Sequence, residues 1–218
     1  MARRIVGVAL RLLAGIALLG GGYHYGARQT VANMAAPSPV DVGFAQFMRG
    51  HHDQAVVMTQ ILLGRGTTRL VGLARSIQTA QLIEIGEMKG WLLLWGKPVL
   101  PATTSMDWML FGKNAPDAEL ARYLSDCRSS PGGMPGMAST QELNELRQLD
   151  GEARDQLFLR LMMRHHQGGL PMAHFAARNA RADAVRTLAA AIEVQQMQEL
   201  VAMAVLQANQ PQNGLGKR

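Results

Sequence analysis

Apolar residues recur at steps of three and four along four long segments of this chain, the spacing of one face of an α-helix. These stripes predict helices over about residues 41–63, 68–95, 152–179 and 182–208. No segment shows the strict alternation of a half-buried strand, and no glycine-rich phosphate loop is present. We therefore expect an all-α protein.

Residues that start or stop helices bound these segments. Gly64 ends the first helix, and Thr67 or Thr68 can cap the second. Residues 97–138 form a proline-rich connection, with a short helix expected near its middle and a glycine-rich turn near its end. A capping box at Ser139-x-x-Glu142 then predicts a short helix before the third long one.

The third long helix contains residues that disfavour a regular helix. Pro171 lacks an amide donor and clashes with the carbonyl four residues earlier, so we expect a bend there. Gly168 and Gly169 each weaken a helix by about 1 kcal/mol relative to alanine. Their presence predicts close contact with another helix at this point.

The two halves of the helical region repeat each other. A shift of 114 or 115 positions aligns these pairs: Asp41 with Asp155, Phe44 with Phe158, Met48 with Met162, His51 with His165, Met58 with Met172, Gln81 with Gln196, and Glu84 with Glu199. We predict two copies of one helical hairpin, residues 41–96 and 139–208, joined by residues 97–138. Each copy needs the other to cover its apolar face.

The N-terminus has the pattern of an export segment. Arg3 and Arg4 precede a run that is apolar except for Arg11, so residues 1–25 are predicted to be a signal peptide or a transmembrane anchor. Cleavage motifs after this run are poor, which favours the anchor. The basic start would remain in the cytoplasm, placing the rest at the cell membrane as an extracytoplasmic domain, or in the secreted or periplasmic space if the segment is cleaved.

The remaining boundaries follow from composition. Residues 26–40 are predicted to be a linker, residues 41–210 a helical bundle, and residues 211–218 a disordered tail. Cys127 is the single cysteine, which excludes an internal disulfide, and we expect it in a loop.

The chain is basic, with a formal net charge of +6 and a pI near 10.1. Its Lys and Arg residues are scattered and are not interleaved with aromatic residues on one face. We therefore expect a solvated basic surface and no nucleic-acid partner.

Paired histidines carry the candidate chemistry. His51 and His52 follow Met48 by one helical turn, and the second copy repeats this triangle. One such pair is readily explained by ordinary hydrogen bonds, but two matched pairs indicate metal binding. The candidate metal residues are His51, His52, His165, His166, Met48, Met162, Glu84, Glu199, Met58 and Met172.

The members of this set differ in how strongly the pattern supports them. For Met58 and Met172, packing in the core is the favoured interpretation. Glu84 and Glu199 can be metal ligands, hydrogen-bond acceptors for histidine N–H groups, or solvated residues, and the sequence does not separate these roles.

Ligand softness indicates the metal. Thioether and imidazole together suit copper, with Cu(I) favoured. Iron is less favoured because Met48 and Met162 stand where a di-iron helix would carry a glutamate. Zinc bound by histidines alone is also less favoured.

These motifs resemble a known bacterial family, domain of unknown function 305, over about residues 41–208. The resemblance is carried by Phe47-Met48-x-x-His51-His52, by Phe158-Leu159-x-x-Met162-Met163-Arg164-His165-His166-Gln167-Gly168, by Met134-Pro135-Gly136-Met137, and by Gln196-x-x-Glu199-Leu200-x-x-Met203. It implies a ferritin-like four-helix bundle, exported or anchored, with copper binding and copper tolerance in some members.

By motif match, the resemblance implies a set of ligand candidates: Met48, His51, His52, Met162, His165, His166 and, more loosely, Met134 and Met137. The chain departs from the pattern at Asp53-Gln54, where the second copy has Gln167-Gly168, and at Pro171. These departures leave open whether both copies bind metal equally.

We expect an exported or membrane-anchored protein that binds or buffers copper, without catalytic residues. One alternative is a ferritin-like metal oxidase that uses the histidines with Glu84 and Glu199. Another is a metal-free bundle that binds an envelope protein. The expected partners are a metal ion, the membrane through the N-terminal helix, and a second copy or an envelope protein.

Overall fold

The structure is a computed structural model that describes residues 20–22, 36–64, 66–130 and 133–209. The chain divides into two compact units, one up to Ala36 and one from Pro37 onward. In the first unit, Gly20, Gly21 and Gly22 are helical. The rest of the predicted anchor, most of the linker and the C-terminal tail lie outside the described residues. Across the described ranges, no helix is both long and apolar enough to cross a membrane.

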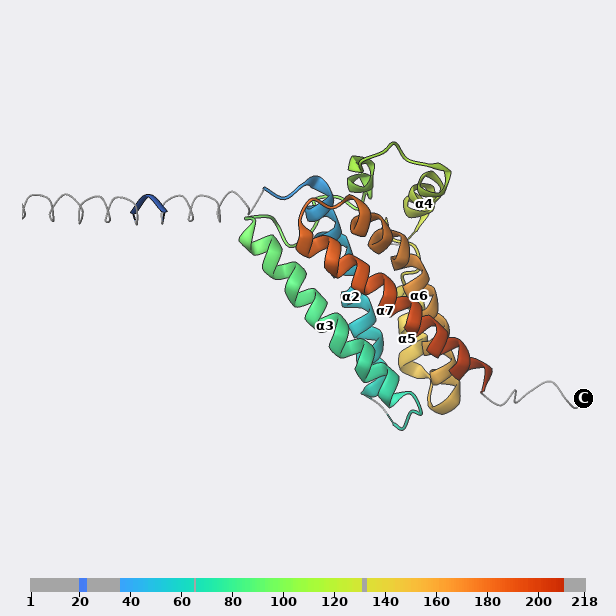
Figure 1. The fold of residues 1–218 in the computed structure, drawn as a ribbon. Coiled ribbons are helices and arrows are strands. Elements are labelled where there is room, and N and C mark those ends of the chain that lie inside the picture. The colour runs from blue at the N-terminus through green and yellow to red at the C-terminus, as the bar shows by residue number, and fades with distance from the viewer. Residues whose placement is uncertain (1–19, 23–35, 65, 131–132, 210–218) are drawn as a thin grey trace, which may run out of the picture. The chain divides into compact units, whose positions relative to one another are not determined.

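The second unit is all-α in its described residues and is built on four long helices (Figure 1). They are α2 (Pro39–Leu63), α3 (Val71–Leu94), α6 (Gly151–Asn179) and α7 (Asp183–Ala208). α2 packs against α6, while α3 packs on α2 and α7 packs on α6. Two helical hairpins therefore contact each other mainly through their first helices.

α2 begins two residues earlier than the sequence pattern indicates. The Ser38 side chain accepts a hydrogen bond from the amide of Asp41, and the Asp41 carboxylate accepts one from the Ser38 amide. Pro39 occupies the first turn, where its missing amide costs nothing. The prediction that the helix starts at Asp41 overlooked this capping box.

The start of α3 also differs from the expectation. Neither Thr67 nor Thr68 caps it; Leu70 is the cap residue and has no side-chain cap hydrogen bond. The Thr68 hydroxyl instead donates to the Asp155 carboxylate at 2.6 Å, a contact across the two hairpins that no local pattern encodes.

Two matched aspartates tie each hairpin to the other. Asp41 of the first accepts hydrogen bonds from the amides of Arg181 and Ala182 in the turn of the second, at 2.9 and 3.0 Å. Asp155 of the second accepts from Thr68 and from the amide of Arg69 in the turn of the first. The reciprocity fixes how the hairpins align along their length.

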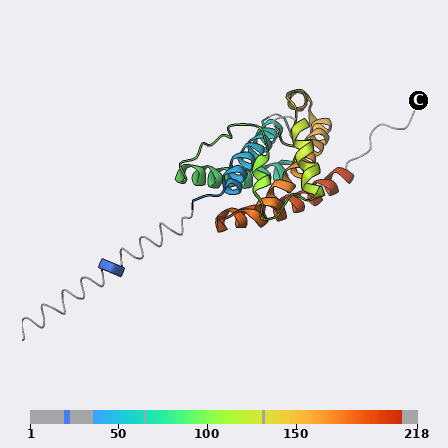
Figure 2. The ribbon, with the colours of Figure 1, turned by 90° about the horizontal axis from the view of Figure 1, so that it is seen from above.

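The connection between the two copies contains η1 (Asp107–Phe111) and α4 (Ala118–Ser129), and α5 (Thr140–Gln148) follows it. Its first part covers one end of the long helices (Figures 1 and 2). Cys127 lies on α4 and is buried, so the expectation of a loop cysteine was wrong. The predicted capping box of Ser139 and Glu142 is confirmed at the start of α5.

The core of the second unit consists of two apolar clusters. One contains Phe44 and Met48 of α2 with Met172 of α6, and the other contains Met58 of α2 with Phe158 and Met162 of α6. Each cluster combines residues from both hairpins. Along all four long helices, a short polar stretch separates the residues of one cluster from those of the other.

Candidate metal centre

The polar stretches of the four long helices form one buried layer between the two apolar clusters. We call this set the polar layer: His51 and His52 of α2, Gln81 and Glu84 of α3, His165 and His166 of α6, and Gln196 and Glu199 of α7. The four histidines have no exposed surface, and the other four residues are at most 9% exposed. The structure thus brings all four paired histidines to one level of the core.

One histidine of each pair lies at the contact between the hairpins. The ring centroids of His51 and His165 are 3.7 Å apart, and the His165 Nε2 atom lies 3.0 Å from the carbonyl oxygen of His51. A carbonyl only accepts hydrogen bonds, so Nε2 of neutral His165 carries the proton. The lone pair of His165 is therefore on Nδ1.

The other histidine of each pair faces a glutamate of its own hairpin. His52 Nε2 lies 2.7 Å from Glu84 Oε2, and His166 Nε2 lies 2.6 Å from Glu199 Oε2. The second contact is a hydrogen bond, whereas the alignment of the first falls outside hydrogen-bond geometry. An ionised carboxylate places the proton on Nε2 and leaves the Nδ1 lone pair free, the arrangement found in carboxylate-supported metal ligands.

Many polar atoms of this layer have no hydrogen-bond partner. They are both ring nitrogens of His51 and of His52, Nδ1 of His165 and of His166, and both amide atoms of Gln81 and of Gln196. A buried polar group without a partner costs about 1–3 kcal/mol. A set of this size in one place indicates that a bound ion, ordered water or both complete the site.

Burial controls the protonation of His51 and His165, the two histidines at the contact between the hairpins. Desolvation lowers the pKa of His51 and of His165 well below the ordinary value, and the neighbouring histidines lower it further. The backbone of Pro135 raises the pKa of His51, and the backbone of His51 raises that of His165, but these are the smallest of the effects. Both rings are therefore neutral at pH 7, which is the form that binds metals.

The two methionines of the predicted triangles are fully buried. Met48 precedes the histidines of α2 by one turn and belongs to the first apolar cluster, and Met162 does the same on α6 in the second cluster. Met172 joins the cluster of Met48, and Met58 joins that of Met162. Met58 and Met172 therefore pack in the core, and their role as ligands stays a prediction.

The two glycines of α6 permit close packing, with other helices at Gly169, as predicted, and with a turn at Gly168. A Cβ atom on Gly169 would lie 2.9 Å from Cε1 of His51 and 3.3 Å from Oε1 of Gln196. A Cβ atom on Gly168 would lie 2.0 Å from the Pro135 carbonyl oxygen. α6 continues as one helix through Pro171, and the predicted bend stays a prediction.

Residues 134–138, which precede α5, pack against the polar layer. They also explain why the first copy has Gln54 where the second has Gly168. In the second copy, Gly168 lets Pro135 approach the helix. In the first copy, the matched Gln54 exchanges two hydrogen bonds with the backbone of Ala138, at 2.6 and 2.8 Å. Met134 of this segment is buried and Met137 is half-buried, both packed with the first apolar cluster.

The histidines do not form a ready-made chelate. Within the described parts of the chain, no three His, Cys, Asp or Glu side chains converge closely enough to hold a metal ion. Stacked rings present their faces to each other, so the in-plane lone pairs of His51 and His165 do not meet at one point. Binding an ion between them requires a ring rotation or a ligand from outside this residue set, such as a methionine.

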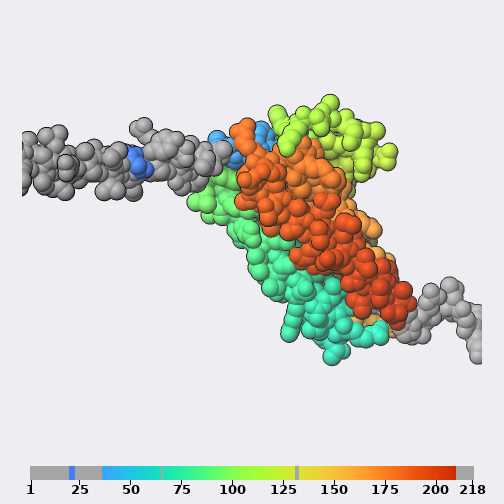
Figure 3. All heavy atoms as spheres, in the orientation of Figure 1, coloured from blue at the N-terminus to red at the C-terminus, as the bar shows by residue number. Residues whose placement is uncertain are grey.

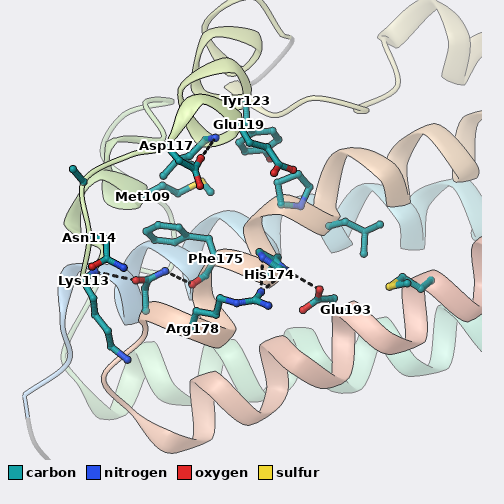
Figure 4. A pocket seen from close by; sticks show the side chains of 16 residues that line it. Met109, Lys113, Asn114, Asp117, Glu119, Tyr123, His174, Phe175, Arg178 and Glu193 are labelled. Carbon is teal, nitrogen blue, oxygen red and sulfur yellow. Dashed lines mark hydrogen bonds and ion pairs between the residues drawn. The ribbon is translucent and has the colours of Figure 1, made fainter.

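A separate cavity of about 510 Å³ lies on the outer side of α6, beyond Pro171 (Figure 4). Its wall includes His174, which lies 2.8 Å from Glu193 of α7 and contacts Arg178. None of the polar-layer residues lines this cavity. The sequence pattern did not indicate it, because its wall combines α4, α6, α7 and the connection.

Solved structures resemble this chain over most of its length. One is a protein of Streptomyces coelicolor, described as secreted, with a domain of unknown function 305 (DUF305). It is 33% identical to this chain, with a TM-score of 0.65 over 78% of this chain and 92% of that one. A DUF305 fragment from Deinococcus radiodurans is 31% identical, with a TM-score of 0.60 over 80% of this chain and 99% of the fragment.

A third structure carries copper. CopM in its Cu(I)-bound form is 25% identical, with a TM-score of 0.55 over 78% of this chain and 96% of that one. CopM in its Cu(II)-bound form gives a TM-score of 0.54 over the same shares. No curated protein sequence matches the chain significantly.

A family model agrees with these structures and with the resemblance noted in the sequence. The model of the domain of unknown function 305 matches residues 41–207, which include every residue of the polar layer. The chain therefore belongs to the domain of unknown function 305 family.

Proposed function

We propose that this protein binds copper as cargo in the polar layer and buffers it or hands it on. The observation that carries the proposal is the group of unpartnered imidazole nitrogens in a fully buried layer flanked by Met48 and Met162. Imidazole with thioether is a donor set that suits copper, and Cu(I) in particular. The copper-bound forms of CopM support this choice of metal.

The residues fit such an ion in their chemistry. Nδ1 of His52, His165 and His166 is free to ligate, since Nε2 of each faces a carboxylate or a carbonyl. Cu(I) accepts low coordination numbers, so two imidazoles and a thioether would suffice. We assign the first coordination shell to these histidines, His51, Met48 and Met162. Glu84 and Glu199 are assigned to orientation of the outer histidines.

The setting of the domain is part of the proposal. We infer that residues 41–210 form a four-helix bundle of the ferritin-like type, preceded by a signal peptide or anchor over residues 1–25. A relative described as secreted supports a location outside the cytoplasm. Copper would then be held in the cell envelope.

Anaerobic Cu(I) titration of the full chain against a colorimetric chelator tests the proposal. A variant with His51, His52, His165 and His166 changed to alanine should lose tight binding, because these side chains provide the nitrogen donors. The His174→Ala variant is the matched control, since His174 lies on the outer side of α6 and should bind as the wild type does. Equal binding by all three proteins contradicts the proposal.

The metal oxidase alternative makes a different demand on the glutamates. It needs Glu84 and Glu199 as ligands, whereas the structure pairs them with His52 and His166. Oxygen consumption after addition of Fe(II) or Cu(I) distinguishes an oxidase from a binding protein. The copper proposal expects no sustained consumption.

One observation favours a protein partner as a second candidate function. α7 exposes Val194, Met197, Val201 and Val205 at helical spacing, and α3 exposes Leu82 and Ile83. Surfaces of these two helices are visible on the same face of the second unit (Figure 3). If the four-histidine variant still binds envelope proteins as the wild type does, this surface acts independently of the metal.

A further inference from the structure

Two glutamines share the polar layer with the histidines and have no structural task there. Gln81 of α3 and Gln196 of α7 occupy matched positions in the repeat and are 2% and 3% exposed. All four of their amide atoms are buried without a hydrogen-bond partner. Leucine at either position would avoid the cost of about 1–3 kcal/mol for each unpaired polar group.

Both glutamines lie on helix faces that contact a histidine. Each glutamine precedes the glutamate of its helix by three residues, so it lies on the face that contacts His52 or His166. The position of one amide is defined by Gly169. A Cβ atom there would lie 3.3 Å from both Gln196 Oε1 and His51 Nδ1, so these atoms border the same point of the core.

The two hairpins are not equivalent at this point. Ala55 matches Gly169 in the repeat, so a methyl group occupies the corresponding position on the side of Gln81. His51 also has two unpartnered ring nitrogens, whereas His165 has one. The absence of a side chain at Gly169 therefore lets the Gln196 amide and the His51 ring approach the same point, which the methyl group of Ala55 prevents on the side of Gln81.

Primary amides have the right chemistry for holding a water molecule and the wrong chemistry for holding copper directly. An amide oxygen is a hard donor better suited to Mg²⁺ or Ca²⁺, and the amide nitrogen has no lone pair to give. In contrast, one amide can donate to an oxygen ligand through Nε2 and accept from it through Oε1.

Resting on the copper function proposed above, we infer that Gln81 and Gln196 hold the water or hydroxide ligands of a Cu(II) ion in the polar layer. Cu(II) takes oxygen ligands in addition to imidazole, whereas Cu(I) is served by imidazole and thioether. The same layer then accommodates both oxidation states: the methionines serve the reduced ion and the glutamines serve the oxidised one. Gln196 contributes more than Gln81, because its amide oxygen borders the same point of the core as the His51 ring.

The test compares the full chain with a Gln81→Leu, Gln196→Leu double variant in separate Cu(I) and Cu(II) titrations. The double variant should bind Cu(II) roughly tenfold or more weakly, the effect of removing groups that support a metal's ligands. Its Cu(I) affinity should stay within about twofold of the wild type. Gln198→Leu is the matched control, since Gln198 is exposed on the same helix.

Electron–nuclear double resonance on the Cu(II) form provides a readout independent of affinity. The wild type should show couplings to imidazole nitrogen and strong couplings to the protons of a bound water or hydroxide, which exchange in D₂O. The double variant should lose only these strongly coupled exchangeable protons, because the exchangeable N–H protons of the ligating imidazoles remain. Metal-free stability gives a third measurement: the midpoint of thermal unfolding should rise, because unpaired buried amides have been removed. A lower midpoint with unchanged copper affinities and couplings overturns the inference and makes the glutamines structural.

The outcomes separate this inference from the proposed function. Absence of nitrogen couplings in the wild type contradicts the copper site itself. Nitrogen couplings that persist, together with strongly coupled exchangeable protons of an oxygen ligand that persist in the double variant, contradict only the role of the glutamines. If the leucine variant does not fold, the Gln81→Asn, Gln196→Asn variant withdraws both amides by one methylene and must lose the exchangeable protons. Their retention overturns the inference.

Discussion

The imidazole rings of His51 and His165 lie with their centroids 3.7 Å apart and their planes tilted by 30°, where α2 packs against α6. Each ring belongs to a different copy of the repeat. The two His-His motifs therefore contribute to one centre between the hairpins, and a single copy would lack half of its residues. This relationship favours one shared site over two independent ones.

The glutamates should tune this centre from outside its first coordination shell. Changing Glu84 and Glu199 to glutamine replaces the carboxylates that face His52 and His166, which should loosen the orientation of both rings. Copper affinity should fall about 10- to 100-fold, as is typical for loss of such partners. Competition titration measures this, with the exposed Glu87→Gln of α3 as control. Complete loss of binding would instead identify the glutamates as ligands.

A methyl group at Gly169 should displace His51. The Cβ atom of alanine would lie 2.9 Å from Cε1 of that ring, so the ring or the helix must move. Gly90→Ala on α3 is the matched control, because nothing lies within 4 Å of the added Cβ there. Gly90→Ala should raise the free energy of unfolding by about 0.5–1 kcal/mol through helix propensity. Gly169→Ala should gain less or lose stability.

The same Gly169→Ala variant should bind copper more weakly than the Gly90→Ala variant, since His51 borders the site. Urea unfolding and Cu(I) titration of both proteins provide the comparison. If both variants gain the same free energy of unfolding and bind copper equally, the methyl group at Gly169 does not displace His51.

Stability of the metal-free protein should fall in mild acid. The pKa values of His51 and His165 are lowered in the folded state, mainly by burial, so the unfolded chain takes up these protons first. The free energy of unfolding has its full value above the unfolded histidine pKa of about 6.5. Below that pH it falls by up to about 1.4 kcal/mol per pH unit for each ring. Urea unfolding between about pH 7.5 and about pH 5 measures the slope.

Replacing both rings separates their contribution from the general effect of acid. A His51→Gln, His165→Gln variant should lose most of this slope, whereas His174→Ala should keep it because His174 is exposed. An identical slope in all three proteins would assign the acid sensitivity to other groups.

Leucine substitutions should distinguish methionines that bind copper from methionines that only pack in the core. Changing Met48 and Met162 to leucine conserves volume, so the free energy of unfolding should change by less than about 1.5 kcal/mol. The Cu(I) affinity should fall if their thioethers coordinate the ion. Met58→Leu with Met172→Leu is the control at equally buried positions, and it should bind Cu(I) as the wild type does. The reverse pattern would exchange the roles of the two pairs.

Helix periodicity and capping chemistry are local, so the sequence alone predicts the long helices and the capping box of α5. The cost of glycine in a helix likewise predicts the close helix contact at Gly169. The caps of α2 and α3 differ from the prediction, because Ser38 caps α2 from within the predicted linker and Thr68 bonds to Asp155 in the other hairpin.

The amino-acid sequence by itself determined the four long helices, the repeat, and the histidines, methionines and glutamates that carry the candidate chemistry. These features depend on spacing along the chain, and spacing fixes which residues share a helix face. Only the tertiary structure decided that His51 stacks on His165, that Glu84 and Glu199 face the outer histidines, and that Gln81 and Gln196 are buried without partners. Those facts depend on the axial alignment of α2 with α6, which contacts between distant residues such as Asp41 and Arg181 establish.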